Sequence, residues 1–130
     1  MSKIPETHLD LLQDETRAIS TLATIMPDGS PQVTPVWFSF DGESIWINSA
    51  KGRLKDRNMR ARPQVALCIL DPQNPYRYLQ IRGRVVEVTE EGAVEHIHQL
   101  SHKYMGQDWN IPLGEVRVRY RLAIERVGAH

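Results

Sequence analysis

The chain has 130 residues, enough for one ordinary domain and too few for two, so we expect residues 1–130 to form a single domain. Sixteen Lys and Arg residues balance sixteen Asp and Glu residues. This zero net charge argues against nucleic acid or an anionic membrane surface as the partner. No apolar run approaches the ~20 residues that span a bilayer, so we expect no membrane partner.

The N-terminal part of the chain predicts a short helix followed by three strands. Residues 5–12 have a proline near their start and leucines at helical spacing. Residues 19–25 alternate apolar and polar side chains, and a turn rich in proline and glycine leads into a second run over 32–40. A further turn leads into 44–48, and we expect the three strands to form an antiparallel meander.

The remaining elements complete a mainly β protein. Residues 51–62 are strongly basic and predict a short helix, followed by an apolar strand over 64–70 with both faces covered. A long strand is expected over 76–89, a helix over 90–105, and a last strand with a cationic outer face over 115–127. Six antiparallel strands with short flanking helices favour a split β-barrel of the mainly β (α+β) class.

The single cysteine, Cys68, cannot form an internal disulfide, and no N-terminal segment resembles an export signal. Both features favour a cytoplasmic protein. Cys68 lies in the middle of the apolar strand over 64–70, where no cation or base within the strand would lower its pKa. We therefore interpret it as a small buried hydrophobe and not as a reactive thiol.

The segment 48–58 is the strongest local sign of a binding site. A strand ends there in small residues and a glycine, and a basic helix begins, so backbone N–H groups and cations can converge on a phosphate. The alternative is a solvated basic helix balanced by acids elsewhere. In the expected strand over 32–40, Pro35 can free backbone groups of its neighbours for hydrogen bonds to a planar ligand, or can simply mark an edge strand.

Histidines and carboxylates give no catalytic or metal site. His98 and His102 share a helix face at i, i+4, but no HExxH pattern or nearby acid completes a ligand set. A solvated helix is the better interpretation. No Ser-His-Asp arrangement or carboxylate pair is evident, so we assign no catalytic side chain.

Several segments, in this order and spacing, resemble the pyridoxamine 5′-phosphate oxidase-like flavin-binding split-barrel family. They are residues 22–25 with 27–32, 35–37, 51–58 with Pro63, and 76–83, and the match spans residues 18–105. Within that family the chain is most similar to the small reductases that use the deazaflavin coenzyme F420. The resemblance implies a homodimer whose cofactor lies at the subunit interface.

The resemblance also implies which residues hold the cofactor. The phosphate would be held by Arg53 and Lys55, with Ser49, Lys51 and Asn58 nearby. Ile47 and Asn48 would contact the ribityl chain, and the ring would run along Gln32, Val33, Thr34, Pro35, Val36 and Trp37. Tyr78 falls where oxidase members place a glutamine against the ring edge, while Trp109 and the last strand would close the pocket from the partner subunit. A longer cofactor tail would need further cations, for which Lys51, Arg57 and Arg77 are candidates.

The expected function is hydride transfer between coenzyme F420 and a small electron-poor substrate such as an enone, a quinone or a conjugated tetrapyrrole. The ring carries this chemistry, and the protein supplies orientation and electrostatics. Vitamin B6 oxidation is disfavoured because the chain has little room for the C-terminal extension that carries the substrate residues of true oxidases. Two alternatives stay open: an FMN-dependent reductase or oxidase of the same fold, and a non-catalytic flavin- or haem-binding carrier.

Overall fold

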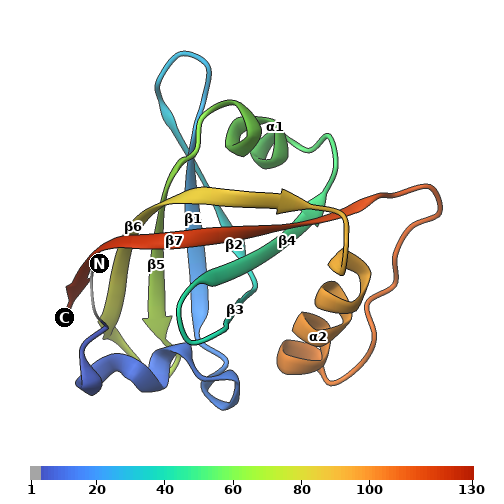
Figure 1. Ribbon diagram of the computed structural model, residues 1–130. Helices are drawn as coiled ribbons and strands as arrows, with labels where there is room; N and C mark the ends of the chain where they lie inside the picture. The colour runs from blue at the N-terminus through green and yellow to red at the C-terminus, as the bar shows by residue number, and fades with distance from the viewer. Residues whose placement is uncertain (1–3) are drawn as a thin grey trace.

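A computed structural model describes residues 4–130 as one curled antiparallel sheet with two α-helices at its margins (Figure 1). The sheet has seven strands in the order β2-β1-β5-β6-β7-β4-β3, and its curl makes the half-barrel expected of a split barrel. The strands are β1 (Ile19–Ile25), β2 (Pro31–Val36), β3 (Phe38–Phe40), β4 (Ile45–Ala50), β5 (Gln64–Asp71), β6 (Asn74–Thr89) and β7 (Arg117–Ala129). The helices are α1 (Leu54–Ala61) and α2 (Ala93–Met105), preceded by the 3-10 helices η1 (Glu6–Leu12) and η2 (Asp14–Thr16).

The predicted strand over 32–40 is two strands, which raises the strand number from six to seven. Its first part, β2, pairs with β1, and its second part, β3, pairs with β4 at the other end of the strand order. Trp37 alone separates the two parts. The antiparallel pairings expected of the meander are confirmed, since β1 pairs with β2 and β3 pairs with β4, but the middle strand of the meander is divided. Because the sheet curls, its two edge strands are consecutive in the chain, and Trp37 lies where the chain passes from one edge to the other.

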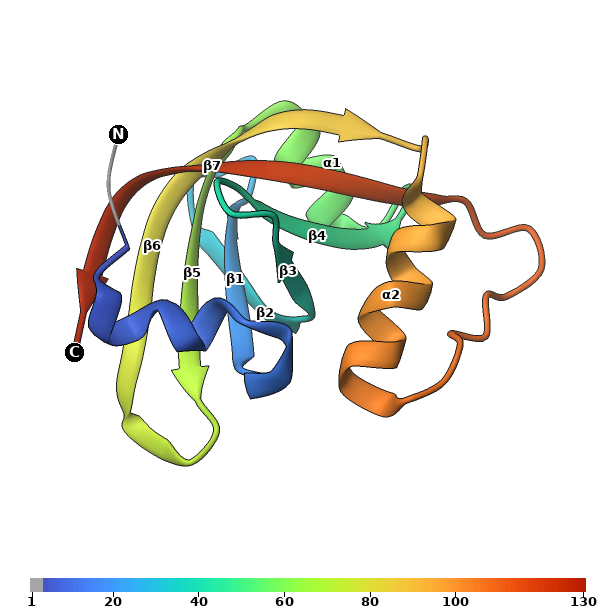
Figure 2. The same cartoon turned by 60° about the horizontal axis from the view of Figure 1, so that its bottom comes forward.

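The N-terminal segment is a pair of 3-10 turns where the sequence predicts one amphipathic helix. Seven residues gain little from α-helical hydrogen bonding, and short 3-10 pieces are common in such positions. Leu11 and Leu12 are buried whereas Leu9 is exposed, so tertiary packing selects a different apolar pair from the one that helical spacing indicates. The segment η1 lies across β5 and β6 (Figure 2).

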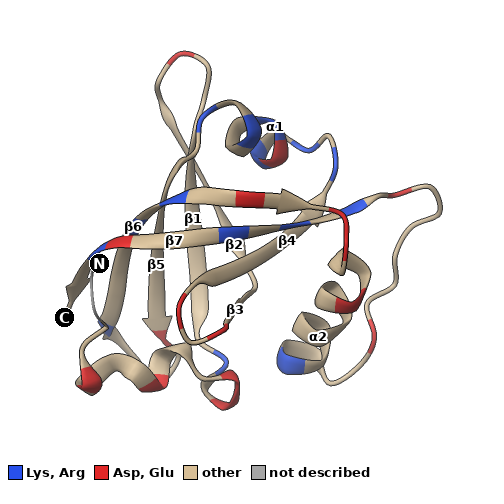
Figure 3. Cartoon of the chain, in the orientation of Figure 1, with Lys and Arg blue, Asp and Glu red and all other residues tan. Residues whose placement is uncertain are grey.

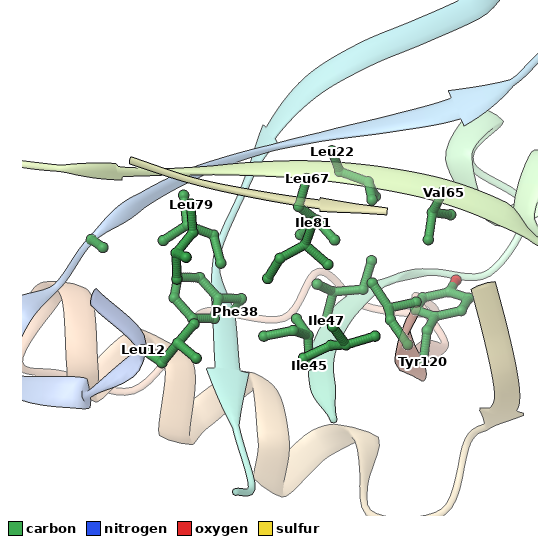
Figure 4. Packing of buried hydrophobic residues seen from close by; sticks show 14 of the residues in the cluster. Leu12, Leu22, Phe38, Ile45, Ile47, Val65, Leu67, Leu79, Ile81 and Tyr120 are labelled. Carbon is green, nitrogen blue, oxygen red and sulfur yellow. The ribbon is translucent and has the colours of Figure 1, made fainter. Parts of the chain in front are cut away.

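The core fills the concave side of the sheet with side chains from almost every strand (Figure 4). Strand alternation decides which side chains these are: in β5, Val65, Leu67 and Ile69 are buried. Cys68 and its outward-facing neighbours on β5 are only half-buried. A single chain therefore covers one face of β5 fully and the other only in part, contrary to the expectation that both are covered. Partial burial raises the pKa of the Cys68 thiol, in keeping with an unreactive cysteine.

Helix α1 is anchored to the barrel by a buried carboxylate. Asp56 accepts hydrogen bonds from the Gly52 N–H at 2.9 Å, the Tyr120 hydroxyl at 2.6 Å and Arg60 Nε at 2.9 Å. On the same helix, Asn58 Nδ2 donates to Thr24 Oγ1 at 3.0 Å. These bonds fix the start of α1 at the end of β4, where the basic segment of the chain begins.

Charge is unevenly distributed although the total is zero. Lys and Arg side chains gather on α1 and the turn before it, while acids concentrate in η1 and η2 (Figure 3). None of the helices within residues 4–130 combines the length and apolar character needed to cross a membrane.

Candidate functional site

A cavity of about 370 Å³ lies between the edge of the sheet, the start of α1 and the inner face of α2. Its walls come from β1, β2, β4, the turn before α1 and its first residues, α2, the loop that carries Trp109, and the start of β7. The lining residues are Ile19, Ser20, Pro35, Val36, Trp37, Asn48, Arg53, Lys55, Ile97, Leu100, Tyr104, Trp109 and Arg117. None of these residues, all within the described chain, is acidic.

One end of the cavity is cationic. Arg53, Lys55 and Arg117 line it, and the carboxylate of Glu115 holds two of them, at 2.6 Å from Arg117 Nη1 and 3.8 Å from Arg53 Nη2. Burial, together with the charges of Arg53 and Arg117, lowers the pKa of Lys55. Three cations and one carboxylate leave a net charge of +2, which favours an anionic ligand at this end.

The cationic end is partly preorganised, because protein contacts fix the position of Arg117. Arg117 is only 7% exposed, and its Nε donates to Asn48 Oδ1 at 2.9 Å. Asn48 Nδ2 in turn donates to the carbonyl of Ala93 at 2.8 Å. Both polar atoms of the Asn48 amide thus bond to protein groups, and the amide holds Arg117 in place. The sequence indicated a cationic last strand without identifying Arg117 as its cavity residue.

The other end of the cavity is aromatic. The rings of Trp37 and Tyr104 stack with centroids 5.3 Å apart, and Trp109 meets Trp37 edge-on at 5.4 Å. The Tyr104 hydroxyl donates to the carbonyl of Ala18 at 2.9 Å, which ties α2 to the start of β1. Because a planar apolar ligand gains from such a wall, the aromatic end complements the cationic one.

The part of β2 beside this cavity is an open sheet edge. Pro31 and Pro35, four residues apart, carry no N–H, and proline in a sheet takes edge positions with its nitrogen facing away from the ladder. The two prolines therefore leave carbonyl groups in excess along the free edge and protect it from pairing with another strand. A planar ligand lying along β2 would meet mainly hydrogen-bond acceptors.

The structure brings part of the predicted site set into the cavity. Those that line it are Pro35, Val36, Trp37, Asn48, Arg53, Lys55 and Trp109. Trp109 packs on Trp37 of its own chain, so it contributes to the cavity of the same protomer. The contribution of Trp109 from a partner subunit stays a prediction.

Most of the other predicted residues do not line the cavity. Asn58 bonds to Thr24 inside the barrel, Gln32 Oε1 accepts the Thr24 hydroxyl at 3.1 Å, and Lys51 pairs with Glu90 at 3.1 Å. Ile47 belongs to the core, and Val33 is exposed. The hydroxyls of Thr34 and Ser49 have no hydrogen-bond partner among residues 4–130.

Arg77 and Tyr78 do not reach this cavity in their own chain. Arg77 bonds to Asp10, to Asp71 at 3.0 Å and to the Thr7 carbonyl at 2.6 Å, and so fastens η1 to β6. The ring of Tyr78 stacks on His130 with centroids 5.5 Å apart. Arg77 is thus engaged in a structural ion-pair network.

Three cavity residues of α2 were not predicted as a site. Ile97, Leu100 and Tyr104 line the cavity from successive turns of the helix. Their spacing of three and four residues puts the three side chains on one face of the helix. That spacing shows which side chains share a face, but not that the face borders a cavity.

His98 and His102 of α2 meet an acid that the sequence did not reveal. His102 Nε2 lies 2.7 Å from Asp108 Oδ1, and His98 Nδ1 accepts the Trp109 N–H at 3.2 Å. These contacts hold the loop that carries Trp109 against α2. Within residues 4–130, no group of three His, Cys, Asp or Glu side chains is arranged to hold a metal ion.

Comparison with known proteins agrees with this architecture. The family model described as pyridoxamine 5′-phosphate oxidase matches residues 4–129. The chain is similar to a solved F420 reductase at 34% identity and a TM-score of 0.85, over 96% of this chain and 98% of that one. It is also similar to a conserved hypothetical protein from Mycobacterium tuberculosis at 25% identity and a TM-score of 0.73, over 98% of this chain and 84% of that one.

Proposed function

The chain belongs to the pyridoxamine 5′-phosphate oxidase family, and from that premise we propose that it is an oxidoreductase that uses coenzyme F420 to reduce a small electron-poor substrate. The polarity of the single cavity described above carries the proposal: three cations at one end and three aromatic rings at the other. A ligand that joins a phosphate to a planar ring through a flexible chain fits both ends at once.

The residues that would hold the cofactor divide by chemistry. Arg53, Lys55 and Arg117 would hold the phosphate, since their charge, less that of Glu115, leaves a net positive charge that attracts a phosphate anion. The ring would lie along the acceptor-rich edge of β2 and against Trp37. When bound, the deazaflavin supplies the hydride, and the apolar side chains of α2 and the aromatic wall orient the acceptor and exclude water.

Two observations favour F420 over FMN. One is the similarity to an F420 reductase at 34% identity. The other is that Arg53 is 59% exposed in its side chain and Arg57 is also exposed, so cations continue from the phosphate end toward solvent, where a longer anionic tail would run. Arg77 pairs with Asp10, so Arg57 is a better candidate than Arg77 for binding the tail of the cofactor.

We include a homodimer in the proposal. Outward-facing side chains of β5, among them Ala66, Cys68 and Leu70, are half-buried and small or apolar, as expected of a face that a second copy covers. The family resemblance implies that such a dimer would bring its cofactor sites to the interface. Light scattering on the purified protein, which measures the mass in solution, should give twice the chain mass.

The decisive experiment is titration of the purified protein with F420 and with FMN, followed by tryptophan fluorescence. Trp37 and Trp109 line the cavity, so ligand binding should quench their emission. We expect micromolar binding of F420 and weaker binding of FMN; the reverse order would assign FMN as the cofactor. Oxidation of reduced F420 on addition of a quinone would establish turnover, whereas tight binding without oxidation would indicate a carrier.

Replacing Lys55 tests the phosphate assignment. Lys55→Ala should weaken F420 binding by about 1.5 to 3 kcal/mol, the range for a lost charge-assisted hydrogen bond. Arg84→Ala is the control, because Arg84 is an exposed cation of β6 that does not line the cavity. Equal affinities of the Lys55→Ala protein and the wild type would refute the phosphate site.

A further inference from the structure

We propose that His96 is a positioning residue: its imidazole orients the Asn48 amide, which aims the Arg117 guanidinium into the cationic end of the cavity. His96 lies on α2, is 4% exposed, and does not line the cavity itself. Its Nδ1 is 3.2 Å from Asn48 Nδ2, and its Nε2 is 2.9 Å from Ser39 Oγ. The inference rests on the proposed function, because it concerns the phosphate end of the same cavity.

The hydrogen-bond partners fix the orientation of the Asn48 amide. Arg117 Nε can only donate, so the atom of Asn48 that faces it at 2.9 Å must be the carbonyl oxygen. The Ala93 carbonyl can only accept, so the amide nitrogen must face it, at 2.8 Å. The same nitrogen then directs its second N–H toward His96 Nδ1.

The orientation of Asn48 fixes the tautomer of His96. Because Nδ1 accepts from Asn48, the proton of the neutral ring lies on Nε2 and is donated to the Ser39 hydroxyl. This is one self-consistent chain of donors, from Arg117 and Asn48 to His96 and Ser39. A proton on Nδ1 would face the amide N–H of Asn48 and break the chain at its centre.

The surroundings of His96 keep the ring neutral. Burial, together with the positive charges of Arg119 and Arg117, lowers the pKa of His96 to about 4. The Trp46 ring lies edge-on to the imidazole, with centroids 6.4 Å apart. At neutral pH, His96 is thus available as an acceptor at Nδ1.

The effect on Arg117 follows from its anchors. Asn48 holds Nε and Glu115 holds Nη1, and two bonds at different nitrogens fix the plane of the guanidinium. Without the Asn48 bond, Arg117 would keep only a carboxylate two residues away on its own chain segment. An anion would then bind a cation whose direction is no longer set before binding, with lower affinity.

Two substitutions separate this role from simple packing. His96→Gln keeps a polar group near the position of Nε2 but offers no acceptor where Nδ1 stands. His96→Asn places its carbonyl oxygen near the position of Nδ1 and should preserve the bond to Asn48. The readout is the ratio of affinities for FMN and riboflavin, because these two ligands differ only at the phosphate. A second pair, F420 and its phosphate-free deazariboflavin, differs at the phosphate and at the tail beyond it.

In the wild type the phosphorylated member of each pair should bind more tightly. His96→Gln should reduce that preference about tenfold while leaving the affinity for the phosphate-free ligand unchanged, and His96→Asn should restore most of it. In an Arg117→Met background, His96→Gln should have no further effect on the ratio.

Each alternative result is informative. An unchanged ratio in His96→Gln overturns the positioning role, and so does an equal loss of affinity for both members of a pair, which a merely structural residue would cause. A wild type that does not prefer the phosphorylated ligand overturns the phosphate site of the proposed function itself. If His96→Gln does not fold, nitrogen-15 NMR of the wild type still tests the proposal, because a proton on Nδ1 of neutral His96 would overturn it.

Discussion

The ring of Tyr104 lies parallel to that of Trp37, with centroids 5.3 Å apart and planes 9° from parallel. Trp37 is the residue at which the chain passes from β2 to β3, and Tyr104 is near the end of α2. The stack therefore joins the closure of the barrel to the helix that walls the cavity. Substitutions at this pair should therefore lower the affinity for the ring of a ligand more than they lower the stability of the fold.

Tyr104→Leu should weaken binding of phosphate-free and phosphorylated ring ligands equally, by about 0.5 to 1.5 kcal/mol, because the aromatic wall is lost. Tyr104→Phe, which loses only the hydroxyl bond to the Ala18 carbonyl, should bind the ring nearly as the wild type does. Calorimetric titration with riboflavin and FMN measures both effects. A loss confined to FMN would contradict the assignment of Tyr104 to the ring end.

Asp56→Asn should destabilise the protein by about 3 kcal/mol, since it disturbs a buried carboxylate with three donors. Burial opposes ionisation, but the Gly52 N–H, the Tyr120 hydroxyl and Arg60 outweigh it and lower the pKa of Asp56. The stability that this carboxylate provides is present above its unfolded pKa and is lost as the pH falls through the lowered value. Urea unfolding should show the gap between wild type and Asp56→Asn shrinking at acid pH, and a constant gap would count against this account.

Acid should also act on the fold through His96. With a pKa of about 4 in the folded protein and about 6.5 in the unfolded chain, only the unfolded state is protonated between these values. The contribution of His96 to the free energy of unfolding is therefore constant above about pH 6.5. Below that pH it should lower the free energy of unfolding, by about 3 kcal/mol at pH 4. The non-titrating His96→Asn protein should lose less over that range in denaturant titrations; equal losses would exclude His96 as the source.

Gly83→Ala should destabilise the sheet by about 3 kcal/mol or more, or prevent folding. A Cβ at Gly83 would lie 1.9 Å from the carbonyl oxygen of Ala123, so β6 and β7 would have to separate at the bulge that they share. Gly128→Ala is the matched control on the same strand pair, because its Cβ would meet only the flexible Gln80 side chain at 3.4 Å. Thermal unfolding of the two variants should differ clearly, and similar midpoints would show that the bulge can relax.

Local pattern alone predicted much of this protein. Alternation over 19–25 and 76–89 gave strands that the structure confirms, and the basic run over 51–62 predicted the helix that contributes Lys55 to the cavity, with Arg53 directly before it. These features are encoded in neighbouring residues, because periodicity and charge density are properties of short segments. The order of motifs also sufficed to indicate the family.

Tertiary structure decided the rest, because a segment's pattern does not specify its partner. Trp37 separates two strands that pair at opposite ends of the sheet, and nothing in the run over 32–40 distinguishes this from one strand. Arg77 and Lys51 are cations of the kind that bind anionic ligands. In the structure Arg77 pairs with Asp10 and Lys51 pairs with Glu90, and both acids are distant in the sequence. Arg117 became a cavity residue only because β7 pairs with β4 and places it beside Asn48, a contact between positions far apart in the chain that no local periodicity encodes.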